Sequence, residues 1–325
     1  MSAMDNSAVA VSVVMSVFNG QRYLRQAIES VLRQAGVSFE FIVIDDASSD
    51  ATAQILAGYS DPRIRIIRNE RNLGLPLSLN KGIALARGAM IARQDADDIS
   101  LPGRLQKQLV YLEEHPGCAL VGSDFFIIDD EDHLLAASSL PSEDQRIRAV
   151  LETKNCFAHS AMMFRKAAFD AVGGYRREFP GCLDYDLALR LSQRYALANL
   201  PERLLRYRVH PQSMSAEKSA RMAFERSLIV LAWQKRRRGE SDAEVLKTPL
   251  PRLKEDPRRL LAGQYYGFAD SLYAGGDARA ARRFSWKSLC LFPFHRQAAG
   301  LLLRTWLPGA VRSWLRNHRS TLCRK

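Results

Sequence analysis

Several features that mark common protein classes are absent from this sequence. Its 325 residues include only five cysteines, with no C-x-x-C spacing, which counts against a disulfide framework and against a zinc site. No stretch approaches the roughly 20 apolar residues that a membrane-spanning helix requires, and the start, Met1 to Asn6, lacks the basic segment of a secretory signal. We therefore expect a cytoplasmic protein with reduced thiols, either soluble or peripheral on the inner face of the cytoplasmic membrane.

Common motifs for binding nucleotides and nucleic acids are also missing. The chain contains neither G-x-x-x-x-G-K-[ST] nor G-x-G-x-x-G, which counts against P-loop and classical dinucleotide-binding proteins. It contains no recognised nucleic-acid module, so we expect no nucleic-acid partner. Hydrophobic residues make up 47% and charged residues 25%, which is ordinary for a globular protein. The length of 325 residues suits one large domain and one smaller one.

Negative charge is scarce in the C-terminal part of the chain. Residues 201–325 contain 26 Lys or Arg against 10 Asp or Glu, a net charge of +16, whereas residues 1–200 have a net charge of −4. Such a basic part favours an anionic partner. Residues 235–238 and 301–316 mix Arg with Trp and Leu, a pattern typical of helices on an anionic membrane surface. A helical bundle packed on itself, with solvated arginines, is the alternative.

The N-terminal part alternates apolar strand-like runs with helical stripes. The runs are residues 8–17, 39–44, 64–67 and 90–92, and helical patterns fit residues 21–34 and 77–86 between them. This alternation predicts an open, mostly parallel sheet with helices on both faces. In such sheets, ligands bind beyond the carboxyl ends of the strands.

The composition changes twice further along the chain. From Pro102 to about Val209 a helix at 102–114 is followed by mixed, less regular segments. After Ser213 the chain reads as basic and helical. We therefore predict one domain over residues 1–213 and a helical module over residues 214–325, part of which resembles a single tetratricopeptide unit. The helices expected in this module are residues 217–237, 258–274, 277–291 and 294–316, with breaks at Pro249/Pro251, Gly275-Gly276 and Pro308-Gly309.

Two acidic clusters follow the strand-like runs. Asp95 and Asp97 come directly after the fourth run, and in an extended backbone alternate side chains share a face. Asp45 and Asp46 follow the second run, so both clusters should lie at one edge of the sheet. Close carboxylates repel each other unless a cation compensates, and Mg²⁺ or Mn²⁺ bridging to a phosphate would do so. For Asp98, capping of the following helix is the alternative.

These motifs occur in an order that resembles the family 2 glycosyltransferases, inverting enzymes with a GT-A fold and nucleotide-sugar donors. The likeness spans residues 10–215, and such collinearity is more specific than any single motif. The matching segments are residues 11–19, 44–50, 72–75, 95–105, 173–175, 184–191 and 207–210. The resemblance implies an α/β fold of GT-A type with a mostly parallel central sheet, to which a C-terminal all-helical extension is added.

The resemblance also implies a role for individual residues. Asp184 would be the general base that takes a proton from the acceptor, with Asp186 as the second choice. The donor nucleotide would lie against Ser16, Phe18, Asp45, Asp46 and Asp95. A divalent metal, Mg²⁺ or Mn²⁺, would be held by Asp97 and Asp95, with His210 as a further candidate. His159, Ser160 and Asp186 would line the acceptor region. The donor would be a nucleotide-diphosphate sugar and the acceptor a saccharide or a lipid-linked molecule, in the synthesis of a cell-surface polysaccharide or lipopolysaccharide.

Some positions leave alternatives open. Members of the resembling family usually carry Glu before the base, where this chain has Leu183. Phe18 would stack on the nucleobase or else be an ordinary core aromatic. Arg71 and Arg104 would neutralise phosphate or acid charge or else be solvated helix or loop residues. A nucleotidyltransferase that makes sugar nucleotides, and a non-catalytic relative that acts as a binding module, are the two rival functions.

Overall fold

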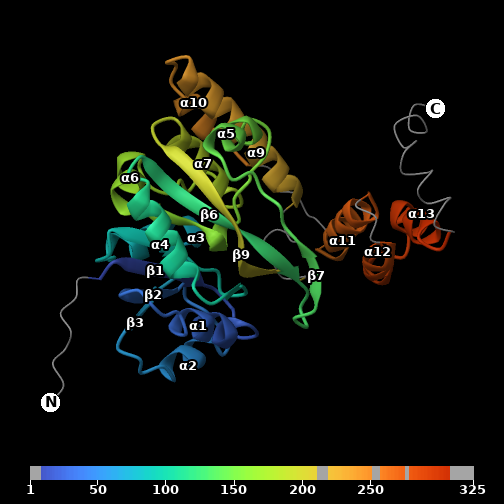
Figure 1. Cartoon of the computed structure of the whole chain (residues 1–325), viewed down its shortest axis with the longest axis horizontal. Helices are drawn as coiled ribbons and strands as arrows, with labels where there is room; N and C mark the ends of the chain where they lie inside the picture. The colour runs from blue at the N-terminus through green and yellow to red at the C-terminus, as the bar shows by residue number, and fades with distance from the viewer. Residues whose placement is uncertain (1–8, 211–218, 251–256, 275–277, 308–325) are drawn as a thin grey trace. The chain divides into compact units, whose positions relative to one another are not determined.

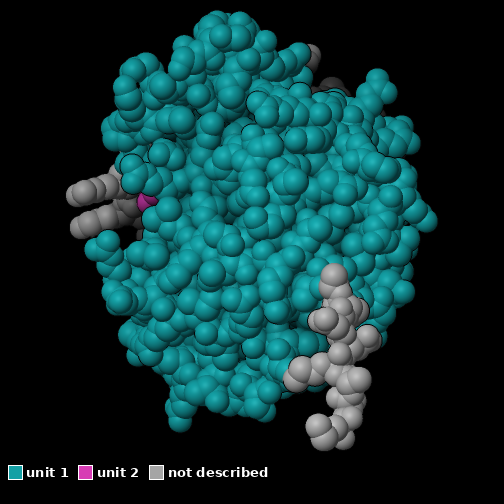
Figure 2. All heavy atoms as spheres, turned by 90° about the vertical axis from the view of Figure 1, so that its left-hand side faces the viewer, with its two compact units in different colours: residues 1–128, 137–208, 223–250 teal, residues 129–136, 209–222, 251–325 magenta. Residues whose placement is uncertain are grey.

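The computed structural model describes residues 9–210, 219–250, 257–274 and 278–307. The chain start, the predicted domain boundary at residues 213 and 214, and the expected helical residues beyond 307 lie outside these ranges. The chain divides into two compact units, coloured in Figure 2. Unit 1 comprises residues 1–128, 137–208 and 223–250, and unit 2 comprises residues 129–136, 209–222 and 251–325.

Unit 1 is built on one mixed sheet (Figure 1), whose strands run in the order β3-β2-β1-β4-β8-β6-β9-β5. The first four strands are parallel, β8 runs antiparallel to β4 and β6, and β5 runs antiparallel to β9. The strands are β1 (Val11–Val17), β2 (Phe39–Asp45), β3 (Ile64–Arg68), β4 (Met90–Arg93), β5 (Ile99–Ser100), β6 (Cys118–Ile128), β8 (Met163–Arg165) and β9 (Ala196–Arg208).

Helices follow the strands of unit 1. In α1 (Leu24–Leu32) the buried residues Leu24, Ala27, Ile28 and Val31 recur at helical spacing, which places one apolar face on the sheet. A Cβ at Gly82 would lie 2.7 Å from Val14 Cγ1, so glycine permits the close approach of α3 (Leu75–Ala84) to β1. The other helices are α2 (Thr52–Ala57), α4 (Arg104–Glu114), α5 (Asp144–Leu151), η1 (His159–Ala161), α6 (Lys166–Ala171), α7 (Leu183–Ser192), α10 (Ala243–Leu246) and most of α9 (Ser219–Arg237), whose residues 219–222 belong to unit 2.

Unit 2 contains most of β7 (Leu134–Ala137) and the helices α11 (Pro257–Ala274), α12 (Ala278–Leu291) and α13 (Arg296–Arg304). Within the described residues, α13 ends at Arg304 and the chain turns through residues 305–307, the three residues before the break expected at Pro308-Gly309. The rest of the expected helix lies outside the described residues. Within the described ranges, every helix is too short or too polar to cross a membrane.

The basic run at residues 235–238 makes ion pairs within unit 1. Lys235 pairs with Glu240, and Arg236 pairs with Asp242. Arg237, which is exposed, pairs with Glu152 at 3.1 Å. Both roles expected for this run, contact with a membrane surface and packing in a bundle with solvated arginines, stay predictions.

Candidate active site

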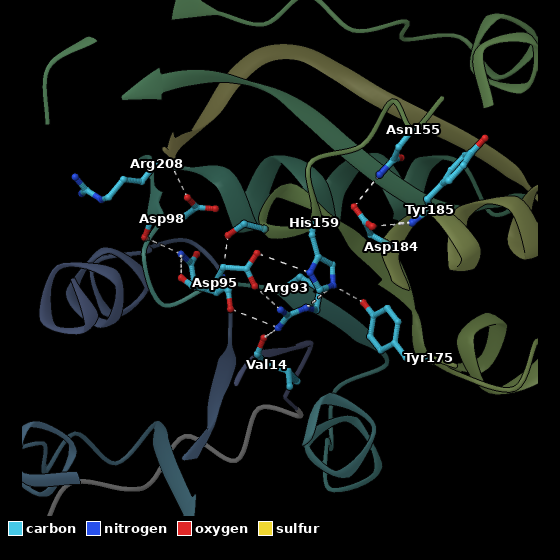
Figure 3. Close-up of polar contacts among 12 residues, drawn as sticks. Val14, Arg93, Asp95, Asp98, Asn155, His159, Tyr175, Asp184, Tyr185 and Arg208 are labelled. Carbon is cyan, nitrogen blue, oxygen red and sulfur yellow. Dashed lines mark hydrogen bonds and ion pairs between the residues drawn. The ribbon is translucent and has the colours of Figure 1, made fainter. Parts of the chain in front are cut away.

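The acidic loop after β4 is held from two sides at Asp95. The backbone N–H of Asp95 donates to Ser160 Oγ at 2.9 Å, and its carboxylate Oδ1 accepts from Arg93 Nη2 at 2.7 Å (Figure 3). Ser160 is fully buried in η1, so it acts on the site through the Asp95 backbone. The structure therefore brings the predicted residues Asp95 and Ser160 together.

Arg93 organises this part of the site. Its side chain is fully buried at the end of β4 and donates to Val14 O, to His159 Nε2 and to Asp95. A guanidinium only donates, so His159 Nε2 must accept. Burial, together with the Arg93 charge, lowers the pKa of His159 well below its usual value, which keeps the ring neutral. The neutral ring then carries its proton on Nδ1, which lies 3.7 Å from Asp95 Oδ2.

Asp98 is fixed by the end of β9. Its Oδ1 accepts from the Arg208 backbone N–H at 2.8 Å, and Arg208 Nε donates to the Asp97 carbonyl at 2.8 Å. The helix that follows has Gly103 as its N-cap, without a side-chain cap. The capping role considered for Asp98 is therefore wrong, since this carboxylate ties the acidic loop to β9.

The loop crowds its carboxylates, and this raises the pKa of Asp95 and of Asp98. Burial raises the pKa of Asp95, Arg93 opposes that rise, and Asp97 adds to it. Burial, Asp97 and Asp95 raise the pKa of Asp98 well above its usual value. Asp98 Oδ2 is buried without a hydrogen-bond partner, and Asp97 is half-buried. A crowded set of hard oxygen ligands fits a divalent cation such as Mg²⁺ or Mn²⁺.

Asp184 lies in the first turn of α7. Its Oδ2 accepts from Asn155 Nδ2 at 2.7 Å, and its Oδ1 accepts from the Tyr185 N–H at 2.8 Å. The N-cap of α7 is Cys182, so capping does not explain Asp184. Burial is the largest cause that raises the pKa of Asp184 to about 6, and the Asp95 charge adds to it. A carboxyl with this pKa is suited to exchange protons near neutral pH.

Tyr175 lies close to both acids. Burial raises the pKa of Tyr175, and the charges of Asp184 and Asp95 also raise it. The Tyr175 hydroxyl lies 3.0 Å from His159 Nε2 (Figure 3). Since that nitrogen carries no proton, the hydroxyl donates to it. The side-chain amide of Asn80 donates to the Tyr175 carbonyl and accepts from the Tyr175 N–H. The charge of Asp95 also raises the pKa of Asp184, so the two acids interact electrostatically within unit 1.

Asp186 has a structural partner. It is fully buried and pairs with Arg190 at 2.7 Å. Arg190 in turn donates to the carbonyls of Val172 and Gly174, in the turn where the two glycines have φ values of +82° and +69°. Asp186 therefore supports the turn that presents Tyr175, and its place in the acceptor region stays a prediction.

The predicted nucleotide residues lie at the carboxyl ends of β1 and β2. Phe18 is 52% exposed, so the core-aromatic alternative is wrong. Asp45 is buried, accepts from the Ser48 N–H and lies 3.5 Å from Arg68 Nε. Asp46 uses both oxygens on Asn69 and on the N–H groups of residues 73 and 74, so it organises a loop. Ser16 is half-buried in β1, opposite Ile44 of β2.

Two further metal-ligand candidates lie in unit 2. His210 belongs to this unit, so its assignment as a metal ligand stays a prediction. Asp129, Glu131 and His133 have ligand atoms within 4.8 Å of one another. Asp129 Oδ2, however, pairs with Lys287 and with Arg283, and these cations of α12 already compensate the buried carboxylate.

Sequence reasoning missed Arg93, Asn155, Tyr175 and Arg208 as residues that shape the site. A charged residue at the end of an apolar strand was the available signal for Arg93, whereas no local pattern marks Asn155. Arg104 is fully buried, so the solvated alternative is wrong. Its charge opposes the rise in the pKa of Asp95, in line with the expected neutralisation of acid charge. It also donates to the Ser160 and Arg93 carbonyls, so it supports the acidic loop.

Comparisons with known proteins agree with this geometry. Residues 12–173 match the family described as Glycosyl transferase family 2. The chain is 39% identical over 210 residues to the putative glycosyltransferase EpsE of Bacillus subtilis, covering 62% of this chain and 74% of that protein. It is 34% identical over 221 residues to the O-antigen biosynthesis glycosyltransferase WbnJ of Escherichia coli, covering 66% and 85%.

A solved structure shows the same fold. The crystal structure of S. aureus TarS 1–349 in complex with UDP-GlcNAc has a TM-score of 0.54 and 15% identity to this chain, covering 91% of this chain and 90% of that one. The mixed sheet and these matches define the class as a glycosyltransferase with a GT-A fold. The chain belongs to glycosyl transferase family 2. The predictions of fold, family and enzyme class are thereby confirmed, and the nucleotidyltransferase alternative is set aside.

Proposed function

We propose that this enzyme moves a sugar from a nucleotide-diphosphate donor to an acceptor hydroxyl, with inversion at the anomeric carbon and Asp184 as the general base. The observation that carries the proposal is the carboxyl of Asp184, whose pKa is raised to about 6 by burial and by Asp95. At neutral pH this group is mostly ionised, yet it is basic enough to accept a proton during attack. Asn155 and the Tyr185 N–H fix its orientation.

The proposed step conserves atoms and charge. The acceptor oxygen attacks the anomeric carbon while its proton passes to the Asp184 carboxylate. The bond from the anomeric carbon to the diphosphate oxygen breaks, and the nucleoside diphosphate leaves with the electron pair. Attack on the face opposite the leaving group inverts the configuration.

The donor would lie across the ends of β1, β2 and β4. Phe18 offers an exposed ring for stacking on a nucleobase, and Asp45 offers a carboxylate to the base or ribose. Asp46 shapes the neighbouring loop. Asp95, held by Arg93 and Ser160, would contact the ribose or share the metal. His159 then acts chiefly by orienting Asp95, beside the acceptor.

A divalent ion fits the acidic loop because the charge of Asp97 raises the pKa of its neighbours Asp95 and Asp98, and a cation would relieve that repulsion. Asp97, with Asp95, would hold it. When bound, the ion would act as a Lewis acid on the departing diphosphate. The chain's own contribution is to position these carboxylates through Arg93 and Arg208.

The acceptor class follows from the relatives. WbnJ is named for O-antigen biosynthesis, and the amylovoran glycosyltransferase AmsE of Erwinia amylovora is 32% identical over 204 residues. We therefore propose an acceptor in the synthesis of a cell-surface polysaccharide, either a free saccharide or a lipid-linked one. Leu183 replaces the Glu that usually precedes the base in this family, which is the one feature that speaks for a non-catalytic relative. The base is nevertheless oriented, because Asn155 donates a hydrogen bond to Asp184.

A panel of nucleotide sugars tests the proposal. Each donor is added with and without Mn²⁺ while thermal unfolding is followed, because a ligand that binds the native state raises its stability. We expect one nucleotide class to stabilise the protein, more strongly with Mn²⁺. The stabilising donor is then used with candidate acceptors, and the anomeric configuration of the product is measured by NMR. A product with retained configuration would contradict the inverting mechanism.

A further inference from the structure

The α12–α13 segment of unit 2 exposes an unusual amount of apolar surface. The four most exposed large hydrophobic side chains among the described residues all lie there: Trp286 at 62%, Phe294 at 82%, Leu303 at 72% and Trp306 at 67%. Large side chains exposed together, rather than singly, mark an interaction surface. We call this set the aromatic ridge.

The two tryptophans of the ridge are connected through Arg282 of α12. The Arg282 guanidinium lies over the Trp306 ring, 3.8 Å from its centroid, and it also donates to the Thr305 carbonyl. Trp286 follows Arg282 by one helical turn on α12. Leu303 lies in the last turn of α13, just before Trp306, and Phe294 lies in the link between the two helices.

The ridge is separate from the face that the helices use to pack. Ala281, Phe284 and Leu301 are buried, and the Phe284 ring lies 5.9 Å from that of Tyr265 on α11. The alternative of a bundle packed on itself explains these inner residues. It leaves the two tryptophans unexplained, because they lie outside that packing.

The charge around the ridge has one sign. Residues 278–307 contain six Lys or Arg and no Asp or Glu. Lys287 and Arg283 are paired with Asp129, whereas Arg279, Arg296 and Arg304 are exposed. Aromatic and leucine side chains beside exposed arginines form the composition of a helix that lies in the interface of an anionic bilayer.

We propose that the aromatic ridge and its arginines bind the surface of an anionic phospholipid membrane. The rings and Leu303 would enter the headgroup region, and Arg279, Arg296 and Arg304 would contact lipid phosphates. Membrane docking would bring the enzyme to a lipid-linked acceptor, but the binding itself does not depend on the donor chemistry proposed above.

Cosedimentation of the full chain with vesicles tests this proposal. We expect binding to vesicles of phosphatidylcholine with phosphatidylglycerol, much weaker binding to phosphatidylcholine alone, and weakening in high salt. Combining Arg279→Glu and Arg304→Glu should weaken binding at least about 30-fold, since each cation contributes about fivefold. Combining Trp286→Ser and Trp306→Ser should weaken it at least about tenfold.

Matched controls are Leu85→Ser and Val110→Ser, which alter exposed apolar residues of unit 1 and should bind vesicles like the unaltered protein. Circular dichroism melting shows whether each variant is folded, and Trp286→Ser alone replaces the double variant if that one unfolds. Absence of vesicle binding would overturn the proposal. Equal binding to both vesicle types would also overturn it, and so would binding that the ridge variants and the control variants change by the same factor. Binding of RNA or a protein in place of vesicles would overturn it as well.

Discussion

Asn155 donates a 2.7 Å hydrogen bond from Nδ2 to Asp184 Oδ2, while its own Oδ1 accepts from the Phe157 N–H. The second bond fixes which end of the amide faces the carboxylate. In the family that this chain resembles, a Glu usually precedes the base, and here that position is the buried Leu183. Asn155 thus provides an orientation for Asp184 that does not depend on that Glu.

The pH dependence of turnover should follow the ionisation of the Asp184 carboxyl. A base must be ionised, so kcat/KM should fall as the pH drops through about 6, the pKa of this carboxyl. Asn155→Ala removes a hydrogen bond that favours the charged form, so the acid limb should move up by about one pH unit. Initial rates from pH 5 to 9 measure this. An acid limb that stays in place in the variant would show that Asn155 does not tune the base.

Replacing Arg93 should destabilise the fold as well as the site. Arg93→Met leaves Asp95 without its buried partner, so the free energy of unfolding should fall by about 3 kcal/mol. Lys107→Met removes the exposed pair with Glu202 and should cost less than about 1 kcal/mol. Urea unfolding compares the two variants. Equal losses would mean that burial of the Arg93 pair has no energetic consequence.

Phe18 should contribute to donor binding through stacking. Phe18→Ala should cost about 1–3 kcal/mol of donor affinity, the usual range for an aromatic ring on a base. Isothermal titration with the donor found in the panel provides the measurement. Leu85→Ala, at another exposed apolar position, should bind the donor normally. If both variants bind the donor like the unaltered protein, Phe18 does not stack on the nucleobase.

Asp97 should be responsible for the metal-dependent part of donor binding. Asp97→Asn should abolish the extra thermal stabilisation that Mn²⁺ gives in the presence of donor, because a neutral amide is a poor ligand for a hard cation. Asp170→Asn, at an exposed position of α6, is the control. A Mn²⁺ effect that persists in Asp97→Asn would place the ion elsewhere.

The regular part of the fold could be predicted because it depends on local patterns. Apolar runs predicted the strands β1 to β4, and the parallel order brought their carboxyl ends, with both acidic clusters, to one edge. Asp95 could be singled out because it follows an apolar run, and Asp184 because residues 184–191 resemble a motif of the family. The end of α13 at Arg304 lies a few residues before the expected break at Pro308-Gly309, since an apolar pattern alone does not show where a helix ends.

The supporting contacts of the site could not be predicted, because they join residues far apart in sequence. Asn155 meets Asp184 across 29 positions, and Arg208 meets Asp98 across 110. Arg104 looks like a surface residue in the sequence, yet its helix turns it under the acidic loop. Such contacts depend on tertiary packing, which cannot be inferred from the spacing of residues along the sequence.

The most direct measurement of the account is the effect of Asp184→Asn on turnover and on donor binding in the same preparation. Removing the base should lower kcat about 10³-fold, while the donor dissociation constant stays within about twofold, because the donor is held by other residues. Asp170→Asn should leave both quantities unchanged. Turnover of Asp184→Asn at the rate of the unaltered enzyme would contradict the assignment of the base and, with it, the proposed mechanism.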